Sequence, residues 1–406
     1  MPYCVAKIGR DEIGYVPAKY DINRKAGVLG AALVNTNGLS HSYAESCAGT
    51  NGIAMKAVVL RSFGGPEQLL LEDVPEPKPT FDEIVLKVAA VSINRSFDLS
   101  VRKGTYSRGA VLPLVLGADP SGTVSAIGKD VTAFKPGDRV AVMSTIACGQ
   151  CQECRRGAAA SCGFSRTIGV HRWGGYAEYV AVPASNAALI PGALSFDHAT
   201  VIARHGAAAY NFLIDRGKLR AGETALVFGA SGALGGFAVQ VAKLSGATVV
   251  AVAGADSRAA FARQLGADAT INYRTGDLVE QVMALTNGRG ADLVFESSGD
   301  PVLWPLALRC VAQAGRMVTC GAHGGGNVQL DLKRLYVGRL QIIGAAGVNV
   351  SDLDRALTAG ARGDIKATID RVYPLERAAE AHGYVERERP IGKVLIAPRR
   401  VFENVS

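Results

Sequence analysis

Four cysteines stand close together in the segment CGQCQECRRGAAASC, at Cys148, Cys151, Cys154 and Cys162. Two residues separate Cys148 from Cys151 and Cys151 from Cys154, and seven residues separate Cys154 from Cys162. This spacing lets four thiolates surround one tetrahedral Zn²⁺, and because protein fills every position, none is left for water or substrate. The pattern therefore predicts a structural zinc. Four free surface cysteines or an iron–sulfur cluster are the alternatives.

A second stretch that could bind a ligand is TALVFGASGALGG, in which an apolar block is followed by glycines at Gly229, Gly232, Gly235 and Gly236. The pattern is typical of a buried strand, a glycine-rich turn and a helix. Glycines let the backbone approach a pyrophosphate, and the free N–H groups at the helix start point at it. A tight turn without a ligand has the same pattern, so the motif alone leaves both open. If it binds a dinucleotide, we expect contacts from Gly229, Ser231, Gly232, Ala233 and Leu234.

The composition limits the classes of protein to which these motifs can belong. The 406 residues are 48% hydrophobic, which is enough for two domains of ordinary size. The net charge is +8, yet no run of five like charges occurs, so nucleic acid is not expected as a partner. No apolar run is long enough to predict a membrane span. Clustered thiols and a nucleotide site favour the cytoplasm.

The elements that must position these residues change in kind along the chain. From Met55, short strands separated by Pro and Gly suggest a compact, partly open β-barrel; they lie near 55–60, 69–74, 82–93, 114–117, 122–127 and 138–142. A helical passage over 195–215 then leads to six strands that alternate with helices, near 225–229, 248–252, 269–272, 292–296, 316–319 and 340–343. Such alternation predicts a six-stranded, doubly wound parallel sheet.

The predicted fold class is therefore α/β with two domains. Strands at 369–373 and 392–396 are expected to return to the first domain, which would comprise residues 55–200 and 346–400. Residues 201–345 would form the dinucleotide-binding domain. Residues 1–54 lack sustained periodicity, which suggests a poorly ordered extension or a functional start at Met55. A secretory signal around residues 26–34 is the alternative.

Six motifs outside the cysteine segment carry a family resemblance: MKAVVL, GADPSGTVSAIG, KPGDRVAV, GGYAEYV, GASGALGG and QLGADATINYR. With the cysteine segment, they resemble the medium-chain dehydrogenase/reductase superfamily over about Met55 to Pro398, with most likeness to its quinone-reductase-like branch. The resemblance implies a GroES-like β-barrel domain, a Rossmann domain and a structural zinc at the four cysteines. It also implies a homodimer formed through the edge strand near Leu340 to Gly347.

Zinc alcohol dehydrogenases of this superfamily also hold a catalytic zinc. At the three corresponding positions this chain has Asn94, Ala118 and Arg204. None of these supplies a thiolate, imidazole or carboxylate, and the neighbouring Asp98 and Asp119 alone would make a poor zinc site. We therefore expect one zinc, and no catalytic metal.

Without a Lewis acid, oxidation of a simple alcohol is difficult, whereas hydride addition to a quinone or an α,β-unsaturated carbonyl needs only hydrogen-bond donors and a proton source. The expected activity is therefore that of an NADPH-dependent reductase. Candidate catalytic donors are Asn94, Ser96, Tyr106, Arg204 and His205. We expect Arg204 to bind an anionic group or to polarise the substrate carbonyl. A zinc-dependent alcohol dehydrogenase with atypical ligands and a non-catalytic cofactor-binding scaffold are the alternatives.

The end of the second Rossmann strand favours NADPH as the cofactor. Enzymes that use NAD carry an acidic residue there for the ribose 2′-OH, but the aligned position is Ala253. Ser257 and Arg258 lie just beyond it, and Tyr273 matches a tyrosine that holds the 2′-phosphate in quinone-reductase relatives. NADH stays possible, because a shifted register would bring Asp256 to the ribose. Backbone contacts to the nicotinamide end are expected from Ser298, Gly321 and Ala322.

Overall fold

The computed structural model describes residues 53–400, which lie within one compact unit of the chain. The predictions for residues 1–52 lie outside the described residues. Among the residues described, no helix combines the length and apolar character that crossing a bilayer requires.

Six parallel strands form the sheet of the second half of the unit. They are β11 (Thr224–Phe228), β12 (Thr248–Ala253), β13 (Ala269–Asn272), β14 (Ala291–Glu296), β15 (Val311–Thr319) and β16 (Gln341–Gly344). Their spatial order is β13-β12-β11-β14-β15-β16, and every neighbouring pair is parallel. The prediction of a six-stranded doubly wound sheet is confirmed. The order reverses beside β11, where open α/β sheets place their ligands.

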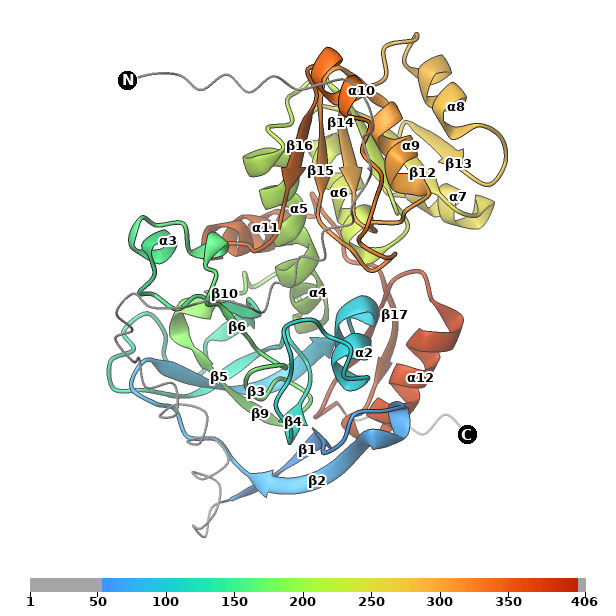
Figure 1. Ribbon diagram of the computed structural model, residues 1–406. Helices are drawn as coiled ribbons and strands as arrows, with labels where there is room; N and C mark the ends of the chain where they lie inside the picture. The colour runs from blue at the N-terminus through green and yellow to red at the C-terminus, as the bar shows by residue number, and fades with distance from the viewer. Residues whose placement is uncertain (1–52, 401–406) are drawn as a thin grey trace, which may run out of the picture. The chain divides into compact units, whose positions relative to one another are not determined.

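The sheet is buried on both faces, which explains the continuous apolar block in β11. Ala225 and Val227 contribute to one hydrophobic cluster, and Leu226 and Phe228 to another on the opposite face. Successive strand residues point to opposite faces, so helices on each side must cover them (Figure 1). These helices are α6 (Ala233–Leu244), α7 (Asp256–Gln264), α8 (Leu278–Leu285), α9 (Leu303–Arg309) and α10 (Leu332–Val337).

Two antiparallel-rich sheets form most of the first half. A three-stranded sheet orders β2-β1-β4, and a larger one orders β10-β6-β5-β3-β18-β17, with β9 also pairing to β3. Their bounds are β1 (Ala54–Leu60), β2 (Leu69–Pro75), β3 (Glu83–Ser92), β4 (Leu114–Val115), β5 (Ser121–Ile127), β6 (Arg139–Val142), β9 (Tyr179–Pro183), β10 (Ala187–Leu189), β17 (Ile369–Tyr373) and β18 (Lys393–Ile396). Because β18 pairs with β3, the predicted return of the C-terminal strands is confirmed.

Short elements complete this half. β7 (Thr145–Ile146) pairs with β8 (Arg166–Thr167), and α3 (Gln152–Arg155) lies between them in the chain. Helix α2 (Arg95–Arg102) follows β3, and α12 (Ala378–Glu388) precedes β18. Single helical turns are η2 (Pro66–Gln68), η3 (Ala159–Ser161), η4 (Ala184–Asn186) and η7 (Leu375–Arg377).

A helical passage joins the two halves. It runs through α4 (Phe196–Val201), η5 (Ile202–Gly206), α5 (Ala207–Tyr210) and η6 (Asn211–Arg216), and α11 (Val350–Arg362) packs against it (Figure 1). Both η5 and η6 are π-helical, a wider winding that recurs at functional sites. Since η5 contains Arg204 and His205, the widened turn positions these two side chains.

Candidate active site

One cavity of about 740 Å³ lies between the carboxyl ends of the parallel strands and the first half of the unit, which holds the antiparallel-rich sheets. It brings together most of the residues that the sequence predicted. Those lining it are Asn94, Ser96, Arg204, His205, Gly229, Ser231, Gly232, Ala233, Leu234, Arg258, Tyr273, Ser298 and Gly321. Segments far apart in the sequence therefore meet in a single pocket.

Three predicted residues are not among those that line the cavity. Tyr106 packs edge-on against Phe97, with ring centroids 5.2 Å apart, so it supports the wall from behind. Ser257 is exposed in the first turn of α7. Ala322 is exposed in the loop after β15.

The glycine turn has the geometry that a close phosphate approach requires. Gly229 adopts a left-handed φ of 64°, and Gly232 is the N-cap of α6. A Cβ on Gly235 would lie 2.2 Å from the Gly229 carbonyl oxygen, so only glycine lets the helix pack this closely on the strand end. Free backbone N–H groups at the start of α6 therefore border the cavity.

The end of β12 is shaped around Tyr273. A Cβ on Gly254 would meet the Tyr273 hydroxyl oxygen at 2.7 Å, so glycine makes room for that hydroxyl. Arg258 lies beside it, with Nη1 3.4 Å from Ser231 Oγ and Nη2 donating to the Arg389 carbonyl at 2.6 Å. Asp256 instead accepts a 2.8 Å hydrogen bond from Asn272 Nδ2 and is absent from the cavity lining. This placement weakens the case for Asp256 as a ribose ligand.

Two arginines that the sequence analysis did not single out join Arg258 at the cavity. Arg95 begins α2, and Arg389 follows α12 with a left-handed φ of 48°. Burial, followed by the like charges of Arg389 and Arg258, lowers the pKa of Arg95. Arg95 has no hydrogen-bond or ion-pair partner within residues 53–400. Three converging cations beside a helix start suit an anionic group such as a phosphate.

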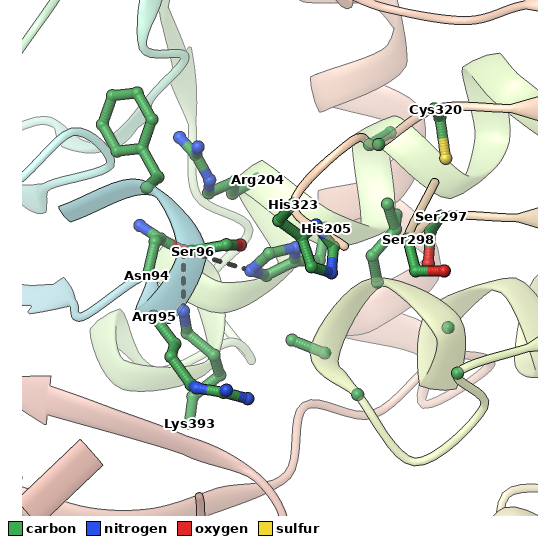
Figure 2. Close-up of a pocket in the computed structure, with 18 of the residues that line it drawn as sticks. Asn94, Arg95, Ser96, Arg204, His205, Ser297, Ser298, Cys320, His323 and Lys393 are labelled. Atoms are coloured by element: carbon green, nitrogen blue, oxygen red, sulfur yellow. Dashed lines mark hydrogen bonds between the residues drawn. The ribbon is translucent and has the colours of Figure 1, made fainter. Parts of the chain in front are cut away.

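The far end of the cavity is built from the ends of β14 and β15. Glu296 is fully buried, and its carboxylate accepts from Ser298 N at 2.7 Å and Gly299 N at 3.0 Å. These bonds fix the loop that presents Ser298 to the cavity. Ser297, Cys320 and His323 also line this end (Figure 2).

A buried polar network backs the cavity on the other side. Lys393 Nζ donates to Asn94 Oδ1 at 2.7 Å and to the Ile93 carbonyl at 2.7 Å. Asn94 Nδ2 donates to Asp119 Oδ2 at 3.1 Å, and His205 Nε2 lies 3.2 Å from Asn94 Oδ1. Figure 2 shows His205 and Lys393 both directed at Asn94. The contacts join β3, β18 and η5, so the network depends on the tertiary fold.

Burial shifts the pKa values of this network strongly. It lowers the pKa of Lys393 to about 8, although the charge of Asp119 opposes the shift. Burial and the charge of Asp119 raise the pKa of Asp98 to about 6. Desolvation, with Lys393 and Arg204 nearby, holds the pKa of His205 well below its usual range. A neutral imidazole is therefore the stable form of His205 near neutral pH.

Arg204 forms part of the cavity wall beside helix α2. Its guanidinium lies 4.7 Å from the centroid of the Phe97 ring, and Nη1 donates to Ser144 Oγ at 3.2 Å. The other guanidinium nitrogens make no hydrogen bond within the described residues. Arg204 can therefore offer a charged donor to a ligand in the cavity.

The four predicted cysteine ligands converge as a separate centre. The Sγ atoms of Cys148, Cys151, Cys154 and Cys162 all lie within 4.8 Å of one another, with closest pairs at 3.5 to 3.9 Å. Zn–S bonds of about 2.3 Å in a tetrahedron require sulfur separations of about 3.8 Å. The thiol set therefore fits a structural Zn²⁺, and no fifth His, Cys, Asp or Glu joins it among the described residues.

Fold and site together define a nicotinamide-dependent oxidoreductase with two domains and a four-cysteine centre. The chain belongs to the medium-chain dehydrogenase/reductase superfamily, in its zinc-binding alcohol dehydrogenase and quinone oxidoreductase group. Residues 80–192 match the model "Alcohol dehydrogenase GroES-like domain", and residues 233–362 match "Zinc-binding dehydrogenase".

The similar proteins include both alcohol dehydrogenases and quinone oxidoreductases. An NAD-dependent alcohol dehydrogenase of Sulfurisphaera tokodaii is 30% identical, over 85% of this chain and 100% of its own. The quinone oxidoreductase of Homo sapiens is also 30% identical, over 81% and 93%. A crystal structure of an NAD-dependent alcohol dehydrogenase superposes with a TM-score of 0.78 at 36% identity, over 85% and 100%. Overall likeness therefore does not choose between the two activities.

Proposed function

We propose that the chain is an NADPH-dependent reductase that transfers hydride to a quinone or an α,β-unsaturated carbonyl without a catalytic metal. When bound, the nicotinamide cofactor supplies the hydride. The glycine turn and the three arginines would hold its phosphates, and the loops after β14 and β15 would orient its nicotinamide end.

The observation that carries this proposal is the donor set around Asn94. At the three positions where zinc alcohol dehydrogenases ligate a catalytic zinc, by resemblance, the chain has Asn94, Ala118 and Arg204. The Asn94 oxygen accepts from the Lys393 ammonium at 2.7 Å, and Ala118 is fully buried and offers no ligand. Arg204 adds a second positive charge. Two cations at such a site would repel a divalent metal ion, so these residues do not fit a catalytic zinc.

Metal-free reduction needs charge stabilisation on the acceptor oxygen as hydride arrives. Arg204 is a charged donor on the cavity wall, beside Asn94, whose guanidinium has nitrogens without a hydrogen bond within the described residues, and Ser96 is a neutral donor. Removing one such donor from an active site typically costs about 10²- to 10³-fold in kcat. We expect Arg204→Ala to reduce kcat by that order, and Arg204→Lys to restore part of it. An Arg204→Ala enzyme with unchanged kcat and KM would exclude this role.

The preference for NADPH is supported by the end of β12. Ala253 supplies no carboxylate to repel a 2′-phosphate, and Tyr273 and Arg258 both border the cavity beside it. NADH is the competing cofactor, since alcohol dehydrogenase relatives are named as NAD-dependent.

Two measurements test the proposed function directly. The purified chain should contain one zinc per polypeptide, and it should oxidise NADPH against at least one member of a panel of quinones, enals and enoyl thioesters. Two zincs per chain with turnover of simple alcohols would instead establish a zinc-dependent alcohol dehydrogenase. No oxidation of NADPH across the panel would favour a non-catalytic scaffold.

We also propose a homodimer formed through β16. This strand ends the six-stranded sheet, and Ile342 and Ile343 on it are half-buried. An unpaired sheet edge is a template for pairing with a second copy. Light scattering should give a mass of two chains for the wild type. Ile343→Lys should reduce this mass to that of one chain, whereas substitution of an exposed residue on α8 should leave the dimer intact.

A further inference from the structure

Hydrogen bonds at both ends fix the orientation of the Asn94 side-chain amide. Lys393 Nζ, which as an ammonium can only donate, lies 2.7 Å from Oδ1. Asp119 Oδ2, which accepts from Ser92 Oγ at 2.6 Å, lies 3.1 Å from Nδ2. Reversing the amide would press its NH₂ group against the ammonium and its oxygen against the carboxylate. Asn94 is 4% exposed, so water cannot compensate for such a reversal.

The fixed amide determines which nitrogen of His205 carries the proton. His205 Nε2 lies 3.2 Å from Asn94 Oδ1, as Figure 2 shows. An amide oxygen accepts and never donates, so Nε2 must carry the hydrogen. The ring is neutral, because burial and the charges of Lys393 and Arg204 depress its pKa. Its lone pair is therefore on Nδ1.

Nδ1 of His205 is the ring nitrogen that the Asn94 amide does not contact. His205 lines the cavity, and within residues 53–400 Nδ1 has no hydrogen-bond partner. A neutral histidine in this tautomer has no proton to give at Nδ1, so the oxygen that gains charge during reduction must use other donors, such as Arg204.

We propose that His205 acts in the cavity as a hydrogen-bond acceptor, and that it selects a substrate carrying a neutral O–H or N–H group. Asn94 is then the positioning residue for His205, and either Lys393 or Asp119 suffices to orient its amide. Quinones and unsaturated carbonyls that bear a hydroxyl group elsewhere in the molecule have such a group. The nature of the substrate rests on the proposed reductase function, whereas the tautomer does not.

Nitrogen NMR of protein labelled with ¹⁵N-histidine tests the tautomer without any turnover. The chain has six histidines, and His205→Gln identifies the His205 signals. We expect protonated Nε2 and unprotonated Nδ1 from pH 6 to pH 8. A proton on Nδ1, or a ring that titrates in this range, would overturn the inference. His382 is an internal reference, because its Nδ1 faces Arg102 and its Nε2 lies 2.9 Å from the Tyr176 hydroxyl.

Two variants test the positioning chain. Asn94→Leu removes the amide, so His205 should populate both tautomers. Lys393→Met retains the hydrogen bond that Asn94 Nδ2 donates to Asp119, so the Nε2–H tautomer should persist. A tautomer that is unchanged in Asn94→Leu would show that Asn94 does not set it. If that variant fails to fold, the wild-type spectrum alone still decides which nitrogen of His205 carries the proton.

Phenol and its methyl ether, anisole, test the acceptor role with saturating NADP⁺ present. Phenol should move the Nδ1 signal upfield and should bind about fivefold more weakly to His205→Phe, which is the usual effect of losing one neutral hydrogen bond. Anisole should do neither. Equal responses to the two compounds would overturn the proposal. If Nδ1 responds to phenol but no acceptor is reduced, the proposed function fails and this inference stands.

Discussion

Replacing Arg258 by alanine should reduce affinity for NADP⁺ much more than affinity for NAD⁺. The guanidinium is already held in place, since Nη2 donates to the Arg389 carbonyl at 2.6 Å and Nη1 lies 3.4 Å from Ser231 Oγ. A held side chain loses little conformational entropy when it binds a phosphate. Hydrogen bonds to charged groups contribute about 1.5 to 3 kcal/mol, which corresponds to about 10- to 150-fold in Kd.

Titration calorimetry with NADP⁺ and with NAD⁺ measures this effect without an acceptor. Arg258→Ala should raise the Kd for NADP⁺ by that factor and the Kd for NAD⁺ by less than about threefold. Arg263→Ala is the matched control, because Arg263 is exposed near the end of the same helix. Equal losses for the two cofactors would refute a 2′-phosphate contact, and tighter binding of NAD⁺ by the wild type would refute the NADPH preference.

Three further outcomes are expected from the described contacts. Gly235→Ala should destabilise the fold by about 1 to 3 kcal/mol and weaken cofactor binding, because its Cβ would overlap the Gly229 carbonyl; thermal melts with and without NADP⁺ measure both. Cys162→Ser should lower zinc content below one per chain and reduce the melting temperature, as chelation of the wild type should. Asp98→Asn should stabilise the protein increasingly as pH rises from 4 to 7, by up to about 3 kcal/mol. The folded-state pKa of Asp98, about 6, lies above the ordinary 3.8, so the wild type loses stability when its buried carboxyl ionises, and the substitution removes that loss. Denaturant melts that show no pH-dependent gain would contradict this.

The sequence alone determined the parts of this protein that are local in the chain. The cysteine centre is encoded within 15 residues, because ligand spacing and thiolate chemistry suffice to predict it. The glycine turn is equally local, since a strand, a left-handed glycine and a helix start follow one another directly. Strand and helix alternation gave the six-stranded sheet, because burial on both faces leaves continuous apolar blocks. Cofactor preference, dimer formation and a cytoplasmic location stay predictions.

Only the tertiary structure decided how the cavity is charged and hydrogen-bonded. Lys393 and Asn94 are 299 residues apart, and nothing in either local segment indicates that one donates to the other. An isolated lysine in an otherwise apolar strand was the available signal for Lys393, but it names no partner. Arg389 likewise lies beside Arg258 at the cavity only because α12 ends there. The physical reason is that pKa values, histidine tautomers and unpaired cations depend on which groups burial brings together, and local sequence patterns do not record those distances.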